Sequence, residues 1–599
     1  MQARQEWVHA MTDQLAHRGP DGSGSLLLED VALGHRRLSI IDLSHSIQPM
    51  STSEGRFHLT YNGEIFNYKE LRAVLEKDGA TFRTAGDTEV LLQVLRYWGP
   101  AGLHKLNGQF AFAFYDESQH ELMVCRDRMG ILPLFYHFDG RRFSFASEIK
   151  ALLALPWIDA ELNPDAVERY LATRSTRAPQ TLFRGIHKLE PGTHLILSAS
   201  GELKKTQWWC LPGPVSNVSG PQEAECLVRD ALTSAVKARL VADVPVGAFL
   251  SGGLDSSLIT ALAATINEKP VTCFVAGFGD ARFDEVPYAQ SVAEHYGLEL
   301  EVVLLDPGAF ISSYEKLTWN RDAPLSEPGD VAVYHIAIQA ASRVKVMLSG
   351  EGADELFAGY PKHRIDQQLD ALQRLPIGLR KYIVPFLERR LAQRASRLRV
   401  AVRALSARSR QERWLNWFAP FTWYELEAMR EGFGGILDES SDVDSDYLNA
   451  MLRNDCGQWL GDNLLERGDR MSMAASIECR PPFMDHNLVE LAFQIPSSLK
   501  CKRGTGKIVL RNIAKDLLPP QIIERRKIGF KVPIDQWFRG EMREYVWDHL
   551  LGTNSFVGEY LSRKVIADIY SRHLSGKNEE LKIWTLLGLE IWHRRFLVM

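Results

Sequence analysis

One nine-residue stretch constrains the fold of this chain more than any other. It reads Phe-Leu-Ser-Gly-Gly-Leu-Asp-Ser-Ser over residues 249–257, and an apolar run over residues 244–250 leads into it. That run has the β-branched and aromatic bias of a buried strand, whereas residues 257–266 carry apolar side chains at helical spacing. The stretch therefore predicts a tight turn between a buried strand and a helix.

This turn is predicted to bind an anion. Gly252 and Gly253 allow the backbone to turn sharply and to approach a ligand closely. Ser251 and Ser256 add hydroxyl donors at the N-terminus of the helix, where free N–H groups and the helix dipole favour phosphate. Asp255 adds a carboxylate suited to magnesium. An ordinary Gly-Ser turn is the alternative, and the stretch lacks the Gly-Lys-Ser/Thr ending of a Walker A loop.

The composition excludes several classes of protein. The chain has 599 residues, enough for two large domains or about three to four of roughly 150 residues. A formal net charge of −5 gives no reason to expect a nucleic-acid partner. No apolar run reaches the roughly 18 residues of a membrane helix, no signal peptide is visible, and the seven cysteines form no CxxC. We therefore expect a cytoplasmic protein that binds neither nucleic acid nor membranes.

The first third of the chain is predicted to be an α+β layered domain. Strands are expected at residues 38–43, 57–61, 109–115, 122–126, 134–138 and 142–146, with helices at 69–77 and 87–98. A segment rich in Pro, Gly and Ser over residues 211–222 predicts a linker.

Beyond the linker, strands and helices alternate. Further strands are expected at residues 271–275, 301–305 and 344–348, with a helix from about 284 to 296. Such alternation predicts a doubly wound parallel sheet covered on both faces, whose ligands lie beyond the carboxyl ends of the strands. Residues 363 to about 445 form an arginine-rich helical insert. We interpret its charges as solvated helix faces rather than a nucleic-acid arm.

A second glycine-rich turn follows the strand at 344–348. It begins Ser349-Gly350-Glu351 and continues to Asp354. In a doubly wound sheet this turn could lie beside the first, so that Asp354 and Asp255 share a magnesium ion and the Ser349–Gly350 backbone approaches a nucleotide. An acidic helix cap is the alternative explanation for its carboxylates.

These strings resemble known families. Residues 251–256 resemble the SGGxDS pyrophosphate loop of the ATP pyrophosphatases, which cleave ATP between the α and β phosphates. Together with SGEGADELFAGY from Ser349, DRMSMAASIECRPPFMD from Asp469, GTGKIVLR from Gly504 and RRKIGFKVPIDQW from Arg525, they resemble the asparagine synthetase B family. The resemblance covers the second half of the chain. It implies a sheet of the ATP-pyrophosphatase type with extra helices, ATP-dependent activation of a side-chain carboxylate, magnesium binding and amide formation with ammonia.

The resemblance also implies site residues. Asp255 and Asp354 match the magnesium aspartates, and Lys527 matches the lysine that stabilises the intermediate. The expected ATP-binding residues are Leu250, Ser251, Gly252, Gly253, Asp255, Ser256, Ala276, Ser349, Gly350 and Glu351. Adenylation and amine attack both develop negative charge that fixed cations would stabilise. Lys527, Lys507, Arg480 and Arg470 are the candidates, although each taken singly could be a surface charge.

The first half resembles a class II glutamine amidotransferase domain. The resemblance rests on residues 18–22, 36–42, 61–68 and 87–90. It implies an Ntn-hydrolase-like αββα layered domain whose glutamine-binding residues are Arg37, Asn62, Gly63, Glu64 and Asp87. Asn62 and the Gly63 amide would be the oxyanion donors.

The nucleophile of that domain is absent from this sequence. The family opens with Met-Cys-Gly-Ile-Ala-Gly and uses the cysteine, whereas this chain opens Met1-Gln2-Ala3-Arg4 and its first cysteine, Cys125, lies in a strand pattern. We therefore expect this polypeptide to lack glutaminase activity and the first strand of the domain. Either the start is misplaced, which the intact pocket residues favour, or the chain is a natural variant that uses free ammonia or another amine.

The sequence thus predicts an amidotransferase-like domain over 1–210, a linker over 211–222 and a synthetase domain over 223–599. We expect a ligase that uses ATP and Mg²⁺ to convert aspartate to asparagine with glutamine or ammonia, and that forms a homodimer as the family often does. The alternatives are a specialised relative acting on another acid, as β-lactam synthetase and lasso-peptide cyclase do, and an inactive nucleotide-binding scaffold.

Overall fold

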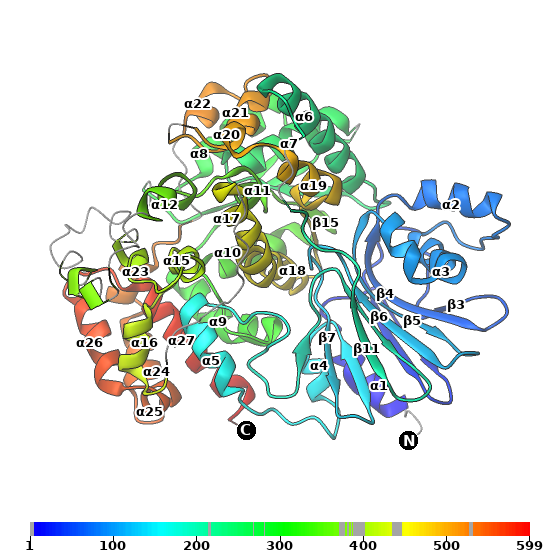
Figure 1. The fold of residues 1–599 in the computed structure, drawn as a ribbon, viewed down its shortest axis with the longest axis horizontal. Coiled ribbons are helices and arrows are strands. Elements are labelled where there is room, and N and C mark those ends of the chain that lie inside the picture. Colours follow the sequence, from blue (N-terminus) through cyan, green and yellow to red (C-terminus); the bar gives the residue numbers. More distant parts are fainter. Residues whose placement is uncertain are drawn as a thin grey trace.

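The computed structural model describes residues 5–598 except 214–216, 268, 281, 371–375, 377, 380–381, 385, 387–399, 401, 434–445, 503 and 526–530. Its N-terminal half contains three antiparallel sheets, drawn from blue through cyan to blue-green in Figure 1. The largest has six strands in the order β11-β10-β6-β5-β4-β3. They are β3 (Met50–Ser51), β4 (Phe57–Ile65), β5 (Gly108–Asp116), β6 (Glu121–Arg126), β10 (Thr193–Leu197) and β11 (Leu203–Gln207).

The smaller sheets and the helices cover this one. The two-stranded sheet pairs β1 (Gly22–Leu27) with β2 (Ala32–Arg37), and the three-stranded sheet holds β7 (Phe135–Phe138), β8 (Phe143–Ala146) and β9 (His187–Lys188). The helices of this half are α1 (Gln5–Asp13), α2 (Tyr68–Lys77), α3 (Asp87–Trp98), η1 (Gly99–Lys105), α4 (Ile149–Leu153) and α5 (Pro164–Thr173). The central strand β5 is buried over nearly its whole length, because helix α3 packs on its neighbour β4 and other elements cover the rest. The predicted strand positions after residue 57 agree with the structure to within a few residues.

The strand predicted at residues 38–43 is wrong. The strand in this region is β2, which ends at Arg37. The backbone of the next residues bonds elsewhere: Ser39 N–H donates to the Asp21 carboxylate, and the Ile40 carbonyl accepts from Asp243 N–H in the second half of the chain. Partners distant in the sequence have overridden the local β-propensity here.

The C-terminal half is built on a five-stranded parallel sheet. Its order is β14-β13-β12-β15-β16, and every neighbouring pair is parallel. The strands are β12 (Val246–Phe249), β13 (Thr272–Gly277), β14 (Leu300–Leu304), β15 (Val346–Leu348) and β16 (Glu478–Arg480). The chain order reverses between β12 and β15, where Ala248 is in register with Leu348. Both glycine-rich turns therefore leave the sheet side by side at its topological switch point, as predicted.

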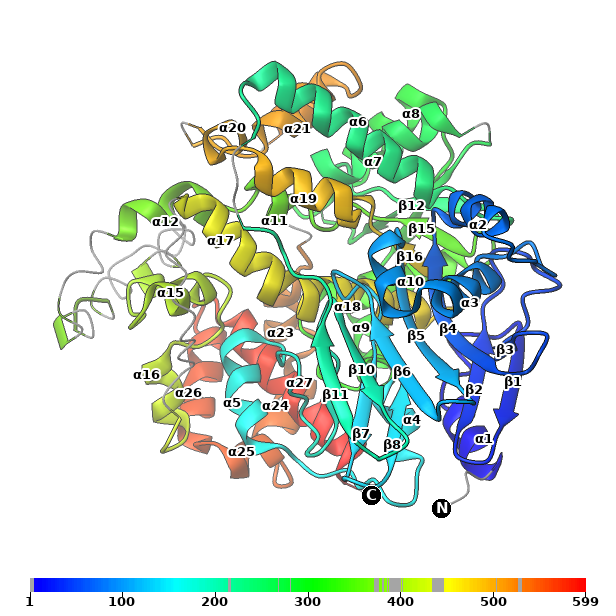
Figure 2. The same ribbon diagram turned by 45° about the vertical axis from the view of Figure 1, so that its right-hand side comes forward.

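Helices surround this sheet (Figures 1 and 2). Those up to the insert are α6 (Pro221–Arg239), α7 (Leu254–Ile266), α8 (Val286–Tyr296), α9 (Pro307–Arg321), α10 (Gly329–Ala340), α11 (Ala353–Phe357), α12 (Lys362–Asp370), α15 (Arg410–Asn416) and α16 (Trp423–Met429). Next come α17 (Tyr447–Asp455), the π-helical η3 (Cys456–Leu465), α18 (Glu466–Met473), η4 (Pro482–Met484), α19 (His486–Gln494), α20 (Ser497–Lys500), α21 (Ile508–Ala514) and α22 (Pro520–Glu524). The last are α23 (Ile534–Arg539), α24 (Arg543–Leu551), α25 (Phe556–Tyr560), α26 (Arg563–Leu574) and α27 (Glu580–Phe596).

Two features of the helices bear on the predictions. Only part of the helical insert predicted over 363–445 falls within the described residues, as α12, α15 and α16. Across the described part of the chain, no helix combines the length and apolar character that crossing a membrane requires.

Candidate functional site

A cavity of about 430 Å³ lies at the switch point of the parallel sheet. All the predicted ATP-binding residues line it except Gly252. The two glycine turns touch there, because a Cβ atom at Gly350 would lie only 2.8 Å from the backbone N of Ser256. Leu250 and Ala276 are buried in its wall, which gives it an apolar part beside the polar turns.

Lys507 joins the two aspartates of these turns. Its Nζ lies 2.5 Å from Asp255 Oδ2 and 2.5 Å from Asp354 Oδ1. Burial alone would lower the pKa of Lys507, but the two carboxylates outweigh it and raise the pKa, so the ammonium keeps its charge at neutral pH. The structure thus brings together three of the predicted residues that come from three separate strings.

The backbone around Lys507 is specialised for this contact. Lys507 itself has a φ of 57°, which non-glycine residues rarely adopt and which often marks functional sites. Gly359 leaves room for the contact, since a Cβ there would lie 1.6 Å from Asp354 Oδ1 and 2.3 Å from Lys507 Cε.

An alternating chain of charges reaches the cavity, and its members Glu327, Glu351 and Arg467 line another part of the wall. Arg467 on α18 donates to Glu351 at 2.9 Å and to Glu327 at 3.0 Å, and Glu327 also accepts from Arg174 at the end of α5. Burial raises the pKa of Glu351 despite Arg467, whereas in Glu327 the two arginines outweigh burial and lower the pKa. The sequence singled out Glu351 but not its partners, because a salt bridge between distant strings has no periodic signal.

Two of the predicted cations do not line this cavity. Arg480 ends β16 and is completely buried, and its guanidinium contacts Glu478 at 2.7 Å and Glu64 of the N-terminal half at 3.2 Å. Arg470 points from α18 toward Glu148 and Asp322. Lys527 falls outside the described residues.

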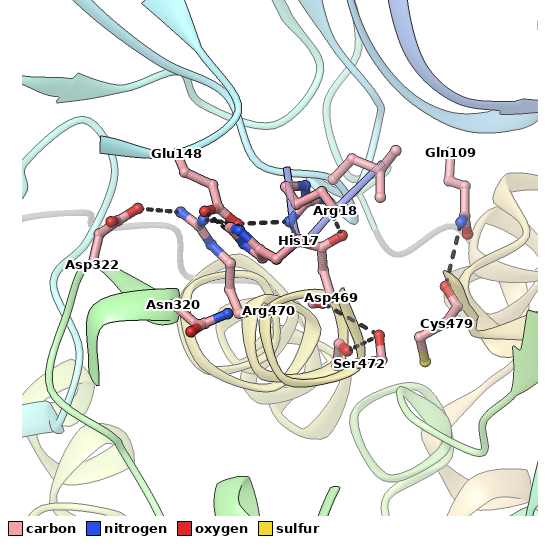
Figure 3. Close-up of polar contacts among 12 residues, drawn as sticks. His17, Arg18, Gln109, Glu148, Asn320, Asp322, Asp469, Arg470, Ser472 and Cys479 are labelled. Carbon is pink, nitrogen blue, oxygen red and sulfur yellow. Dashed lines mark hydrogen bonds and ion pairs between the residues drawn. The ribbon is translucent and has the colours of Figure 1, made fainter. Parts of the chain in front are cut away.

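Arg470 belongs to a buried cluster of charges where the two halves meet (Figure 3). Arg18 places both terminal nitrogens on Asp469, each at 2.8 Å, and also donates to Glu148 at 3.0 Å. Arg470 Nη1 lies 2.8 Å from the same Glu148 carboxylate. Glu148 and Arg18 come from the N-terminal half and the other two from α18, so these ion pairs fasten one half to the other.

A second cavity, of about 380 Å³, lies in the N-terminal half. Arg37, Asn62, Gly63, Glu64 and Asp87, the five predicted glutamine-binding residues, all line it. The amide nitrogen Nδ2 of Asn62 is buried there and has no hydrogen-bond partner among the described residues. An orphaned donor facing a cavity is suited to a ligand oxygen.

The two acids of this cavity, Asp87 and Glu64, have different surroundings. Asp87 accepts hydrogen bonds from Tyr61 Oη at 2.8 Å and from Ile65 N–H at 3.0 Å. Burial and the charge of Asp87 raise the pKa of Glu64 well above its usual value, although Arg480 opposes the shift. Cys125 does not line this cavity; it lies fully buried in β6, in agreement with the strand pattern around it.

The cavity of about 430 Å³ offers carboxylate oxygens, which are ligands that magnesium prefers. No group of three or more His, Cys, Asp or Glu side chains in the described part of the chain is arranged to hold a metal. Magnesium commonly takes only one or two carboxylates, with phosphate oxygens and waters completing its shell. Asp255 and Asp354, which reach the same ammonium group, fit a magnesium ion that arrives with a nucleotide.

Comparison with known families shows to which family this chain belongs. The family described as "Asparagine synthase" matches residues 227–594, and the "Glutamine amidotransferase domain" matches residues 1–209. The chain belongs to the asparagine synthase family. The antiparallel sheets of its N-terminal half therefore carry the amidotransferase domain, and the parallel sheet carries the synthase domain.

Three relatives show the range of this family. Asparagine synthetase [glutamine-hydrolyzing] 1 of Bacillus subtilis is 34% identical over 605 residues, which cover 98% of this chain and 94% of that protein. A putative asparagine synthetase of Mycobacterium bovis is 33% identical and covers 97% of this chain and 92% of its own length. The amidase chry2 of Gibberella zeae is 28% identical, with 90% and 87% covered. The chain is thus similar over nine-tenths or more of its length both to asparagine synthetases and to an amidase.

Proposed function

We propose that this protein is an ATP-dependent ligase that converts aspartate to asparagine. The aspartate side-chain carboxylate attacks the α phosphorus of ATP and displaces pyrophosphate. Ammonia then attacks the acyl carbon of the β-aspartyl adenylate, and AMP leaves. The products are asparagine, AMP and pyrophosphate.

The meeting of Asp255, Asp354 and Lys507 carries this proposal. The turn at Ser251 offers backbone N–H groups and hydroxyls at the start of α7 to a triphosphate. Asp255 and Asp354 would hold magnesium, which neutralises phosphate charge as pyrophosphate leaves. Lys507 adds a permanent cation within reach of both aspartates, so negative charge that develops at the phosphates is stabilised without moving protein groups.

A pyrophosphate-release assay tests the proposal. The protein is supplied with ATP, Mg²⁺ and ammonium chloride, and aspartate is compared with glutamate and with no acid. We expect pyrophosphate and asparagine in equal amounts when aspartate is the acid, and no pyrophosphate with glutamate or without an acid. Absence of acid-dependent pyrophosphate with aspartate and with every other acid tested would exclude a ligase and leave the inactive nucleotide-binding scaffold.

The N-terminal cavity is proposed as the glutamine site. Arg37 would supply a positive charge for the carboxylate of glutamine, and the carboxyl groups of Glu64 and Asp87 would accept hydrogen bonds from its amino group. Asn62 Nδ2 with the Gly63 amide would receive its carbonyl oxygen. The expectation that this polypeptide releases no glutamate remains a prediction. Measuring glutamate release from glutamine, with and without ATP and aspartate, tests it, and sustained turnover would contradict it.

The second candidate function is ATP-dependent amidation of an acid other than aspartate. The similarity to the amidase chry2 over 90% of this chain favours it, because relatives of this architecture do not all bear the name asparagine synthetase. In that case the pyrophosphate assay would give turnover with another carboxylate and not with aspartate.

The finer architecture is part of the same proposal. We infer an Ntn-hydrolase-like αββα arrangement for residues 1–210, a linker over 211–222 and an ATP-pyrophosphatase-type sheet within 223–599. A homodimer is proposed from the family resemblance. Light scattering of the purified chain tests the dimer, and cleavage by a protease within 211–222 that leaves two stable fragments would support the boundary.

A further inference from the structure

Arg525 and Glu285 face the nucleotide cavity from two segments far apart in the sequence. Arg525 follows α22, and Glu285 directly precedes α8. Arg525 Nη2 donates to Glu285 Oε1 at 2.8 Å, and its Nη1 donates to the carbonyl oxygen of Gly252 at 3.2 Å. The guanidinium group therefore touches the first glycine turn directly.

The surroundings of Arg525 hold it at this turn. Its guanidinium carbon lies 4.0 Å from the ring centroid of Tyr288 on α8. The turn is pressed against the same residue, since Gly252 has a φ of 64° and a Cβ there would lie 2.5 Å from Tyr288 Cβ. Arg525 is thus held in place by contacts with the glycine turn, with Tyr288 and with Glu285.

Arg525 retains unused hydrogen-bonding capacity. Its side chain is only 8% exposed, and its Nε is buried without a hydrogen-bond partner among the described residues. A buried N–H group with no partner is costly, so its presence beside a cavity calls for a ligand acceptor. A guanidinium group matches the geometry of phosphate oxygens better than an ammonium group does, because it offers parallel N–H donors.

Glu285 holds the arginine only loosely. Burial raises the pKa of Glu285 to about 7, although Arg525 opposes the shift. Part of the Glu285 population is then protonated at neutral pH, which weakens its attraction for the guanidinium group. A polyphosphate, with several negative charges, would therefore displace Glu285 from Arg525.

We propose that Arg525 binds the β and γ phosphates of ATP, which leave as pyrophosphate, and that Glu285 is a positioning residue for it. Glu285 keeps the guanidinium group at the glycine turn before the nucleotide arrives, and it competes for that group when pyrophosphate dissociates. The inference rests on the proposed use of ATP, and it assigns the β and γ phosphates to the Arg525 side of the cavity.

Binding of inorganic pyrophosphate and of AMP, each measured calorimetrically with Mg²⁺ and the full chain, tests this assignment. AMP lacks the β and γ phosphates, so it reports on the rest of the site. In Arg525→Gln we expect the Kd for pyrophosphate to rise roughly 30-fold, as for the loss of a charged hydrogen-bond donor, while the Kd for AMP changes less than twofold. The Kd of Arg525→Lys for pyrophosphate should lie between those of the wild type and of Arg525→Gln, because lysine keeps the positive charge and loses the parallel N–H donors. Equal weakening of both ligands, or no change in either, overturns the proposal.

Glu285→Gln gives the discriminating result, because the expected effect has the opposite sign. Without the competing carboxylate, pyrophosphate should bind several-fold more tightly and inhibit turnover more strongly. If Glu285 only stabilised the local fold, pyrophosphate would bind equally or more weakly, and that outcome also overturns the proposal. This variant and Arg525→Lys carry the test if Arg525→Gln does not fold.

Arg282→Gln is the matched control. Arg282 lies three residues before Glu285, is 68% exposed and pairs with Asp280 rather than with a cavity residue. The same loss of one positive charge should leave pyrophosphate binding unchanged; a loss equal to that of Arg525→Gln would point to general electrostatics and overturn the assignment. If the wild-type protein binds neither ATP nor pyrophosphate, the proposed function and this inference fall together. If both ligands bind and Arg525→Gln alters neither, only this inference falls.

Discussion

Arg18 and Asp469 form a two-pronged ion pair across 451 positions of the sequence, with both N–O distances at 2.8 Å. Arg18 is 5% exposed and so is Asp469. Removing one partner of a buried pair costs about 3–5 kcal/mol, because the charge left behind loses a counter-charge. We predict a loss of stability of this size for Asp469→Asn, measured by urea unfolding of the full chain.

The pair between Arg56 and Asp116 is the control for that measurement. It has the same two-pronged geometry, with N–O distances of 2.8 and 2.7 Å, but it lies on the surface. Because solvent screens exposed pairs, Asp116→Asn should shift the unfolding midpoint far less than Asp469→Asn. Equal shifts would show that burial does not determine the strength of the Arg18 pair.

Lys507→Gln should impair catalysis while exposing a cation site. Loss of a fixed charge at the phosphates should reduce pyrophosphate release by at least about 100-fold. The two aspartates would also lose their shared counter-ion, so Mg²⁺ should bind the nucleotide-free variant more tightly than the wild type. Lys515→Gln, which removes an exposed lysine from the end of α21, should change neither quantity. Weaker Mg²⁺ binding in Lys507→Gln would contradict this explanation.

Gly359→Ala tests the contact between Asp354 and Lys507 without removing a charge. The added methyl group would occupy the position of Asp354 Oδ1, so the carboxylate must move away from the lysine. We expect pyrophosphate release to fall at least about 10-fold, with a loss of stability of about 1–3 kcal/mol from overpacking. Gly457→Ala is the control, because apart from the adjoining backbone of its own helix no atom of the described residues lies within 4 Å of the added Cβ there. Full activity in Gly359→Ala would show that the contact is dispensable.

Lys500 predicts a pH dependence of stability. It is completely buried, its Nζ donates to Asn449 Oδ1 at 2.8 Å, and burial lowers its pKa to about 7. Between pH 7 and 10.5 the unfolded chain binds this proton and the folded chain does not, so the contribution of Lys500 makes stability rise with pH over that range.

The variant Lys500→Met isolates this contribution. It should be more stable than the wild type by about 5 kcal/mol below pH 7, with an advantage that shrinks toward pH 10. Urea unfolding of both proteins at pH 6 to 10 measures the difference, and Lys204→Met, at an exposed lysine, should show no such trend. A difference that stays constant with pH would contradict the assignment.

Local patterns in the sequence were sufficient for the turns and most of the strands. The turn at Ser251 and the turn at Ser349 were placed correctly, because strand ends and glycine turns depend on neighbouring residues. The strand expected at residues 38–43 failed for the opposite reason, since Ser39 and Ile40 bond to residues far along the chain.

The residues of the candidate site likewise fall into those that local sequence identifies and those that only the fold brings together. Its individual members, among them Asp255, Asp354 and Lys507, stand in recognisable strings and could be named beforehand. Glu285 and Arg525, in contrast, are separated by 240 positions, and no pattern of spacing links them.

By itself, the sequence determined the two glycine turns, many of the strands and helices and which family they resemble, because these depend on short-range preferences and on strings of adjacent residues. Only the tertiary structure decided which charges meet. Arg480 turned toward Glu64 and away from the nucleotide cavity, and Lys507 came to lie between two aspartates. The physical reason is that a buried charge must find its counter-charge wherever packing brings one within reach, and packing joins residues that the linear order keeps apart.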